Sequence, residues 1–392
     1  MKLAWGPEEE AFRSELETFL DEHIPPEAAA GADFMDDWDD DEAIVPSWLR
    51  RWQATLFDHG WMVPGYPPEL GGRNCTPVQT LIYLEVMSGR RVPRTGHFPG
   101  YAIVAPSLLE FGTAEQKQLA PAAIRGDTIW CIGMSEPNAG SDLAGLQTRA
   151  AVFDDQFVVN GQKVWTSYAT IAQKCFCYVR TDPDAPKHKG ISLLIVDMDT
   201  PGIDVRPLRH LSGKAHFAEV FFDDVVVPRE NLVGQLNGGW LLTQGSLAHE
   251  RAGLWVEGVG RLEQNVIALV ELAKKTGKDT DPNARRRIAA AYEFASSLRA
   301  LGYKGFSSFA QGSSAPEHSF MKLATSEAGK AAYELGMELL GGYGAVVDRS
   351  LPVEDGRWAH GFFMSFANTI AGGSSEIQRN IIAQRVLGLP RG

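Results

Sequence analysis

Two short segments of the chain carry residue types suited to holding a flat, polar ligand. Residues 134–142 read MSEPNAGSD at the expected exit of a strand, where small residues and hydroxyls let backbone amides approach a ligand. Residues 165–167 read WTS, an aromatic followed two positions later by a hydroxyl, which suits a flat heterocycle that needs one hydrogen bond. Each segment taken alone also fits a structural role, the first as a plain polar loop and the second as a half-buried strand.

Sequence motifs of several other chemistries are absent. The chain has no GxxxxGK[ST] phosphate loop, no HExxH zinc motif, no GxSxG nucleophile elbow and no strand-linked GxGxxG. Its nine histidines lack metal-ligand spacing, so no metal site is predicted. A nicotinamide-dependent enzyme, a hydrolase and a metalloenzyme are therefore disfavoured.

The overall composition excludes two further classes of function. Of 392 residues, 37 are Lys or Arg and 49 are Asp or Glu, which gives a formal net charge of −12 and a pI near 5.3. Such a chain lacks the basic surface that general nucleic-acid binding requires. No apolar run approaches the roughly 18 residues of a membrane span, and the N-terminal MKLAWGPEEEAF has no secretory apolar core. Four cysteines indicate buried thiols in a reducing compartment, so we expect a cytoplasmic protein.

Hydrophobic periodicity divides the chain into three parts that must position these segments. Helical spacing predominates in residues 1–127, strand-like runs follow in 128–236, and helical spacing returns in 237–392. We therefore expect a mainly α protein with a middle β-domain and domain boundaries at these positions. In the last part the helices are expected at about 239–275, 283–312, 316–340 and 375–387.

Turn dipeptides subdivide the start of the β-patterned part. Asp154-Asp155 and Asn160-Gly161 interrupt the run AAVFDDQFVVNGQKVWTS. Asn-Gly is a strong signal for a two-residue hairpin turn. The sequence therefore predicts three strands here, the last of which ends in the WTS segment.

Four segments resemble the acyl-CoA dehydrogenase family in their order and spacing. They read CIGMSEPNAGSDLAGLQTRA, NGQKVWTS, VFFDDVVVPRENLVG and GGSSEIQRNIIAQRVLGLP, and the resemblance extends to FRSELETFLDEHIP and LLEFGTAEQK near the start. The residue sequences of the LAHER and GGSSEIQRNIIA segments are similar to those of actinobacterial members that act on branched or steroid side-chain thioesters. The resemblance implies an N-terminal helical domain, a β-barrel-like middle domain and a C-terminal four-helix bundle. It also implies FAD, held between the last two domains.

The resemblance assigns roles to individual residues. It implies that Trp165 lies beside the isoalloxazine and that Ser167 occupies a hydroxyl position near flavin N5. It implies substrate contacts at Ser141, Arg251 and Gly372. The full implied set of cofactor-binding residues is Ile132, Met134, Ser135, Gly140, Ser141, Trp165, Thr166, Ser167, Ser374 and Glu376.

The expected base departs from the commonest pattern of the family. Many members carry the catalytic glutamate in a Tyr-Glu-Gly-Thr segment, whereas residues 371–374 read AGGS and place Gly372 at that position. Other members use a glutamate on the first bundle helix, just before the pocket arginine, which here is Glu250 before Arg251. A carboxylate on an apolar helix face is tuned toward use as a base. We therefore expect Glu250 to be the catalytic base.

The implied activity is FAD-dependent α,β-dehydrogenation of an acyl-CoA thioester to a trans-2-enoyl-CoA. The expected electron acceptor is electron-transfer flavoprotein or a similar protein. Ala371 and Gly372 replace two large side chains of the family, which indicates room for bulky acyl groups. Two alternatives remain: a non-catalytic or FAD-completing subunit of a heteromeric dehydrogenase, and a flavin oxidase or monooxygenase of the same fold.

The expected assembly is a tetramer. Residues 274–278 read KKTGK, where homotetrameric members usually carry Arg-x-x-Phe-Gly that reaches a neighbour's FAD pyrophosphate. Because both the arginine and the phenylalanine are missing, we expect a heterotetramer of two copies of this chain with two of a related chain. The rival is a homotetramer in which lysine or another residue contacts the phosphates.

Overall fold

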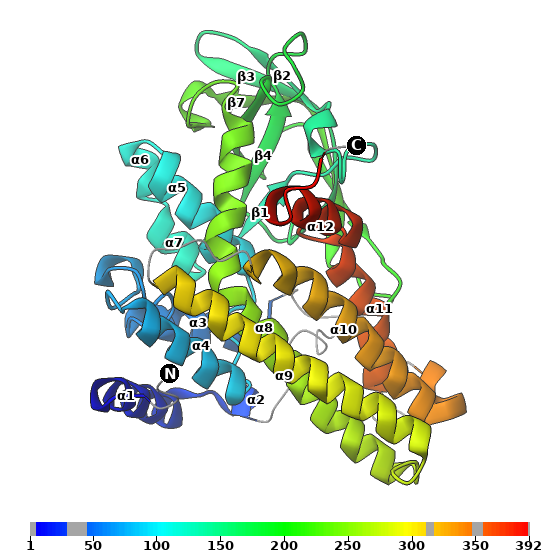
Figure 1. Ribbon diagram of the computed structural model, residues 1–392. Helices are drawn as coiled ribbons and strands as arrows, with labels where there is room; N and C mark the ends of the chain where they lie inside the picture. The colour runs from blue at the N-terminus through cyan, green and yellow to red at the C-terminus, as the bar shows by residue number, and fades with distance from the viewer. Residues whose placement is uncertain (1–4, 30–44, 311–316, 347–355, 391–392) are drawn as a thin grey trace.

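A computed structural model describes residues 5–29, 45–310, 317–346 and 356–390 of the chain. The described residues run from a helical part through a sheet to a second helical part, in the order expected from the sequence (Figure 1). Among these residues, none of the helices combines the length and apolar character that a membrane span requires.

The first part is a set of short helices packed around one apolar core. Two of them begin with a capping box, in which Thr76 pairs with Gln79 and Thr113 with Gln116, so their first backbone N–H groups are satisfied locally. The elements are α1 (Pro7–His23), α2 (Pro26–Ala29), α3 (Ser47–Asp58), η1 (Pro68–Leu70), α4 (Pro77–Gly89), the π-helix η2 (Gly100–Val104), α5 (Ala105–Phe111), α6 (Ala114–Lys117) and α7 (Ala120–Arg125).

The middle part is an eight-stranded sheet with the order β6-β7-β3-β2-β4-β5-β8, and β1 pairs with β4 in parallel. One face of its longest strands encloses a core of Val, Phe and Cys side chains. The elements are β1 (Trp130–Gly133), η3 (Leu143–Gly145), β2 (Arg149–Val152), β3 (Gln156–Ser167), β4 (Lys174–Arg180), β5 (Ile191–Asp197), β6 (Ile203–Leu208), β7 (Phe217–Pro228), η4 (Arg229–Asn231) and β8 (Leu232–Val233).

The hairpin predicted at Asn160-Gly161 was wrong. Instead, β3 continues through this dipeptide to Ser167 and pairs with β7 on both sides of it. Gly161 has φ +149° and lies in a β-bulge, where a Cβ would come within 2.7 Å of Thr148 Cα. The glycine therefore admits a close backbone approach within one strand, rather than a chain reversal.

The last part is a helical bundle. The three long helices have nearly the bounds expected from periodicity, but α11 lies outside the expected helices, and its buried face includes Gly361 and Ser365 besides apolar residues. Trp358, Phe362 and Phe366 nevertheless recur every four residues, so the sequence of this helix does carry a helical apolar repeat. The elements are α8 (Gly239–Lys275), α9 (Pro282–Ala310), α10 (Glu317–Leu340), η5 (Gly341–Ala345), α11 (Arg357–Ile370), α12 (Ser375–Ile381) and the π-helix η7 (Ile382–Val386).

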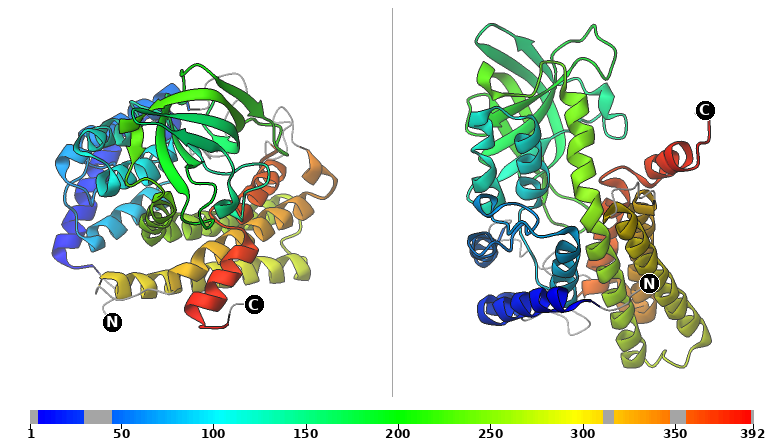
Figure 2. Two further views of the ribbon diagram at one scale, coloured as in Figure 1. Left: turned by 90° about the horizontal axis from the view of Figure 1, so that it is seen from above. Right: turned by 60° about the vertical axis from the view of Figure 1, so that its left-hand side comes forward.

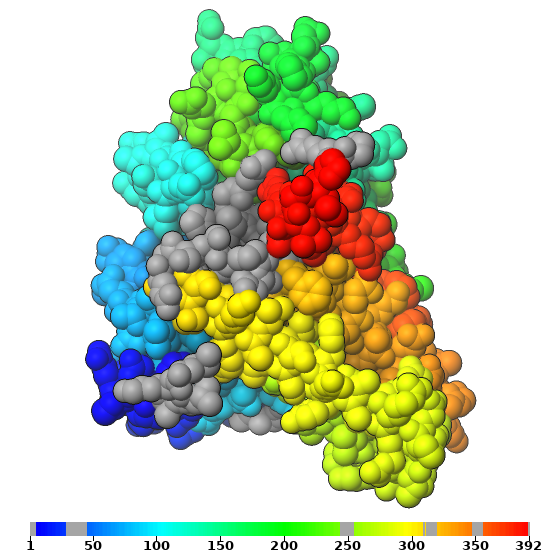
Figure 3. Space-filling model, in the orientation of Figure 1, coloured from blue at the N-terminus to red at the C-terminus, as the bar shows by residue number. Residues whose placement is uncertain are grey.

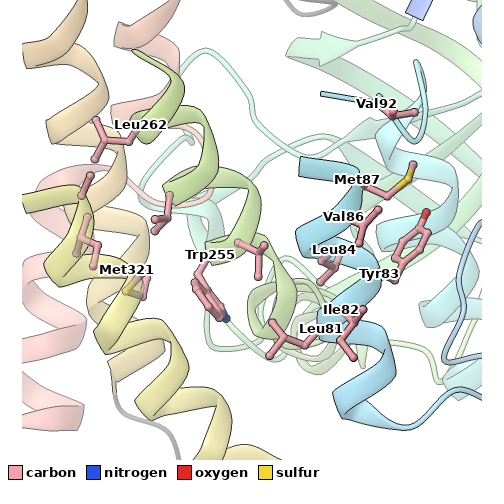
Figure 4. Close-up of a cluster of buried hydrophobic side chains, with 14 of the residues drawn as sticks. Leu81, Ile82, Tyr83, Leu84, Val86, Met87, Val92, Trp255, Leu262 and Met321 are labelled. Atoms are coloured by element: carbon pink, nitrogen blue, oxygen red, sulfur yellow. The ribbon is translucent and has the colours of Figure 1, made fainter. Parts of the chain in front are cut away.

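Helix α8 connects all three parts. It runs from the sheet along the bundle (Figure 2) and packs on α4, η2, α5, β5, α9 and α10. Figure 4 shows α8 between the bundle and α4, which carries Leu81 and Leu84, and the Trp255 ring of α8 packs on Tyr303 of α9 with centroids 5.6 Å apart. Because Leu81, Leu84 and Trp255 belong to one continuous buried cluster, the N-terminal helices and the bundle share a single core.

Alanine substitutions at two glycines of α10 test how tightly this core is packed. A Cβ at Gly336 of α10 would meet the fully buried Trp358 ring at 2.0 Å, whereas a Cβ at Gly329 of the same helix would meet nothing within 4 Å. We expect Gly336→Ala to lower the free energy of unfolding by about 1–3 kcal/mol through overpacking. Gly329→Ala should raise it by up to about 1 kcal/mol through helix propensity. Urea unfolding measures the free energy of unfolding of both variants. Equal stabilisation by the two substitutions would contradict the packing of α10 on α11.

Candidate functional site

The two ligand-binding segments expected from the sequence lie side by side. Val164 N–H donates to the Ser135 carbonyl at 2.9 Å, and Lys163 Nζ donates to the Met134 carbonyl at 3.2 Å. Ile132 precedes them in β1 and is half-buried. The segment that leaves β1 therefore follows β3 as far as the residue before Trp165.

A buried ion pair fixes this arrangement. The Lys163 side chain is fully buried, and its Nζ lies 2.8 Å from Glu136 Oε1. The Glu136 carboxylate also accepts the N–H groups of Gln147, at 2.6 Å, and Thr148, at 2.8 Å. Burial opposes ionisation of Glu136, but the Lys163 charge and these hydrogen bonds outweigh burial and hold the pKa of Glu136 below its ordinary value.

Trp165 occupies an unusual backbone conformation. Its φ is +60°, within a β-bulge between Lys163 and Thr166, and 55% of its surface is exposed. A bulky residue with positive φ costs about 1–3 kcal/mol and persists only where its surroundings impose it. Here Lys163 is anchored on one side, and Thr166 and Ser167 pair with β7 on the other. The fold thus stabilises an aromatic ring in an exposed position.

Phe217 and a histidine pair support the Trp165 ring. The Phe217 ring lies edge-on to Trp165, with centroids 5.8 Å apart at 83°, and 5.5 Å from the His210 ring. His210 Nε2 lies 3.2 Å from His216 Nδ1. Burial, and then the charges of His360 and Lys214, lower the pKa of His210.

Residues 165–167 differ in how far their side chains are exposed. Thr166 is fully buried and its hydroxyl has no hydrogen-bond partner among the described residues. Ser167 is only half-buried, directly opposite Phe217 on β7. The exposed Trp165 indole and the half-buried Ser167 are thus accessible to a flat ligand, whereas the Thr166 side chain is enclosed.

The rest of the first segment forms a turn between two buried residues, with Pro137 and Asn138 exposed at its tip. Glu136 and Ala139 exchange backbone hydrogen bonds of 3.0 Å, and Gly140 and Ser141 follow on the surface. A Cβ at Gly140 would meet nothing within 4 Å, so packing within this chain does not require glycine there. Open space on this side of the turn leaves room for a ligand.

The C-terminal segment belongs to the bundle. Gly372 and Gly373 have φ +66° and +98°. Gln378 Nε2 donates to the Gly372 carbonyl at 2.8 Å, and Lys322 Nζ donates to the Gly373 carbonyl at 2.7 Å. Ser374 caps α12. Glu376 is exposed, and hydrogen bonds from its own N–H and then from Ser374 lower its pKa. No hydrogen bond found within the described residues joins this segment to residues 132–141 or 165–167.

The expected base and pocket arginine lie on α8. The backbone of Glu250 and Arg251 is helical, but their side chains lie outside the described residues. The proposed roles of these two side chains therefore stay predictions.

The sequence motifs did not single out Glu136 and Lys163 as an anchoring pair. A signal was present, because Lys163 follows Phe157 and Val159 at even spacing and so occupies an inward-facing position of β3. A lysine at such a position predicts a buried partner. The bulge at Trp165 has no comparable signal.

The ion pair generates a stability prediction. Glu136→Gln should lower the free energy of unfolding by about 3–5 kcal/mol at neutral pH, because it leaves the Lys163 charge buried and unpaired. The native pKa of Glu136 lies below its unfolded value, so the pair stabilises the protein above the unfolded pKa and this contribution is lost as pH falls through the native pKa. The difference between wild type and variant should therefore shrink in acid.

Asp142→Asn is the matched control for this prediction. Asp142 pairs with Lys187 at 2.8 Å, but both side chains are 63% exposed. Exposed pairs contribute at most about 1 kcal/mol. Denaturant unfolding across a pH series compares the variants; equal effects of the two substitutions would show that Glu136 is not an anchor.

Comparison with known proteins places this geometry in a family. Models of the acyl-CoA dehydrogenase N-terminal, middle and C-terminal domains match residues 6–127, 131–225 and 237–387. Acyl-CoA dehydrogenase IpdE1 of Mycolicibacterium smegmatis is 35% identical over 402 aligned positions, which cover 98% of each chain.

Two solved structures are similar over the full length of both chains, each at 30% identity and 100% coverage. They are the Tcur3481-Tcur3483 steroid ACAD, with a TM-score of 0.85, and the ChsE4-ChsE5 complex from Mycobacterium tuberculosis, with a TM-score of 0.79. The resemblance seen in the sequence motifs and the expected fold are confirmed. The chain belongs to the acyl-CoA dehydrogenase family.

Proposed function

We propose that the protein is an FAD-dependent acyl-CoA dehydrogenase that converts an acyl-CoA thioester to its trans-2-enoyl-CoA. The observation that carries this proposal is the exposed Trp165 indole on its imposed bulge, beside the Met134–Ser135 backbone. Members of this family generally bind FAD. An aromatic wall, a hydroxyl at Ser167 and an open turn at Gly140 suit a flavin bound against the sheet.

The reaction needs a base on one side of the acyl chain. The α-proton of a thioester is weakly acidic, so a positioned carboxylate must remove it while the carbonyl oxygen is stabilised. Glu250 takes that proton, Arg251 and Ser141 hold the substrate, and Gly372 leaves space beside the acyl chain. When bound, FAD supplies the acceptor for the β-hydride.

The glycine turn supports a base on α8. Gly372 and Gly373 both have positive φ, a region that a residue with a side chain occupies only under strain. The turn is held through its carbonyls, and it presents no carboxylate. The base must therefore come from another element, and α8 carries Glu250.

The base assignment gives a kinetic prediction. Glu250→Gln should keep FAD and bind thioester while slowing anaerobic flavin reduction by roughly 10²–10⁴-fold, the usual effect of a lost general base. Stopped-flow absorbance of the flavin with straight, branched and ring-bearing acyl-CoA esters measures it.

Glu271→Gln is the matched control, because Glu271 lies on the same helix but is exposed and paired with Lys274. It should reduce flavin at the wild-type rate. Near-normal flavin reduction by Glu250→Gln would refute the base assignment. Immediate reoxidation of the reduced flavin by air would favour the oxidase alternative.

We propose that the acyl group is bulky. Small residues at 371 and 372 leave volume that a straight chain would not fill, so contacts would be lost with small substrates. Similarity to a structure named as a steroid ACAD supports a ring-bearing substrate class. In the same anaerobic panel, ring-bearing or branched esters should therefore show a higher kcat/KM than butyryl- or octanoyl-CoA.

We propose that this chain assembles with a related dehydrogenase chain. At the end of α8, Lys274 is paired with Glu271 at 2.8 Å, and Lys278 Nζ donates to the Glu338 carbonyl at 3.0 Å. These lysines already have partners within the chain, and neither offers the planar fork that binds phosphate bidentately. Two of the similar structures are named as pairs of chains.

Exposed apolar side chains on the bundle support an assembly. Helices α9 and α10, yellow and orange in Figure 3, form much of the outer surface of the bundle. Exposed apolar side chains mark interaction surfaces where they gather in one patch. Among the described residues from α8 onward, the large apolar side chains more than half exposed are Leu241, Ile267, Tyr292, Tyr343, Ile370, Leu387 and Leu389.

Expression of this chain alone tests the assembly. We expect substoichiometric FAD and little activity, both restored by co-expression with a related chain that carries the missing arginine. Native mass and flavin absorbance of the purified protein provide the measurement. A stable homotetramer with full flavin content and full activity would contradict the heteromeric assembly and leave the dehydrogenase proposal standing.

A further inference from the structure

A surface pocket lies beside the turn that carries Ser141. It has a volume of about 320 Å³ and lies between the η3–β2 segment and the loop that joins β4 to β5. Small-molecule sites typically have volumes of about 300–1,000 Å³. Three cationic side chains line this pocket, those of Arg149, Arg180 and Lys187, and we call it the arginine pocket. In a chain with a formal net charge of −12, three cations around one small cavity create a local positive potential.

Arg149 and Arg180 are direct neighbours in the sheet. They are partners in the parallel pairing of β2 with β4, so their side chains leave the sheet on the same face. Like charges at opposite positions of neighbouring strands destabilise the pairing. No ion pair found within the described residues includes either guanidinium. The two positive charges are therefore held together without a carboxylate to balance them.

Arg180 also builds the pocket. Its Nη2 donates to the Ala144 carbonyl at 2.6 Å and its Nη1 to the Lys187 carbonyl at 2.8 Å, which joins the two walls. These carbonyls are neutral and leave the guanidinium charge in place. Burial lowers the pKa of Arg180, and the more distant charges of Glu136 and Asp182 oppose this shift only in part. A bound anion would remove the imbalance.

Lys187 connects the pocket to the turn at Ser141. Its Nζ lies 2.8 Å from the carboxylate of Asp142, the residue after Ser141. Because Asp142 balances Lys187, the unbalanced charge of the pocket is that of the two arginines. The pocket wall begins at Ala144, three residues after Ser141, so the two Cα atoms are at most about 11 Å apart. A ligand that contacts Ser141 can therefore continue into the arginine pocket.

We infer that the arginine pocket binds a dianionic phosphate group at the nucleotide end of the CoA thioester. This inference rests on the proposed dehydrogenase activity, and it assigns a site to the part of the substrate remote from the acyl group. The diphosphate and the 3′-phosphate of CoA each carry about two negative charges at neutral pH. Two unbalanced guanidinium groups match that charge, and their planar N–H forks suit phosphate oxygens.

FAD is a second source of the same chemistry, because it also contains a diphosphate. Its ring is proposed to lie at Trp165, which adjoins residues 134–135 at the start of the first segment. The arginine pocket lies at the other end of that segment, beyond Ser141. The position of the pocket therefore favours a phosphate of the substrate over the diphosphate of FAD.

Binding to the FAD-loaded protein tests the inference without turnover. Isothermal titration calorimetry compares CoA, dephospho-CoA, which lacks the 3′-phosphate, and pantetheine, which lacks both phosphate groups. The wild type should bind CoA more tightly than pantetheine, and its affinity for CoA should fall as ionic strength rises. Arg149→Met should weaken CoA binding by roughly 10-fold, as expected for a lost hydrogen bond to a charged group, and leave pantetheine binding unchanged. The probe at which affinity is lost identifies the phosphate that is bound.

The same variant should change kinetics in a defined way. With one acyl group presented on CoA and on pantetheine, Arg149→Met should lower the CoA-to-pantetheine ratio of kcat/KM by roughly 10-fold. The loss should appear in KM with kcat unchanged, because the phosphate lies far from the reacting atoms and is bound equally in the ground and transition states.

Two further variants control for charge and for folding. Arg206→Met makes the same change of charge at an exposed arginine of β6, which pairs with Asp204 outside the pocket, and it should leave the ratio unchanged. Arg149→Lys keeps the charge but loses the planar fork, so it should bind CoA more tightly than Arg149→Met does. Arg149 is exposed, so these substitutions leave the core intact.

The outcomes separate this inference from the proposed function. Equal wild-type affinity for CoA and pantetheine, or equal effects of Arg149→Met and Arg206→Met, would overturn the inference. Loss of FAD from Arg149→Met with an unchanged CoA-to-pantetheine ratio would assign the pocket to FAD and overturn it as well. Failure of every thioester to reduce the wild-type flavin would overturn the proposed function, while calorimetry would still decide whether the pocket binds CoA phosphate.

Discussion

The buried Glu136–Lys163 pair is the interaction on which the site depends. Removing two charges from water costs several kcal/mol for each ion, and the pair is favourable only if its remaining hydrogen bonds are satisfied. Glu136 meets that condition with two backbone N–H groups, and Lys163 adds a carbonyl of the same segment. The pair therefore joins the turn after β1 to β3 two residues before Trp165 and helps to impose the bulge that exposes the indole.

Helix α8 joins the sheet to the N-terminal helices and to the bundle. It packs on the sheet, on the N-terminal helices and on the bundle, so a residue on it has a defined position relative to all three parts. The proposed base at Glu250 lies on the same helix. A base on this helix would therefore keep a constant position relative to the sheet and the N-terminal helices.

The order of the three parts and the bounds of α8 could be predicted, because long periodic stretches report burial directly. Prediction failed where tertiary packing overrides local signals. Asn160-Gly161 has the composition of a hairpin turn, but Gly161 is required instead for close approach to Thr148. In the site, motif resemblance singled out Trp165 and Ser167, but the strained backbone of Trp165 is a property of the folded strand pair.

Anaerobic mixing of the FAD-loaded protein with a ring-bearing acyl-CoA ester tests the central claim most directly, with flavin absorbance and thioester product followed together. We expect loss of the oxidised flavin spectrum, with one trans-2-enoyl-CoA formed for each flavin reduced. A protein that holds FAD beside Trp165 but leaves it oxidised with straight, branched and ring-bearing esters alike, also when co-expressed with its partner chain, would contradict it.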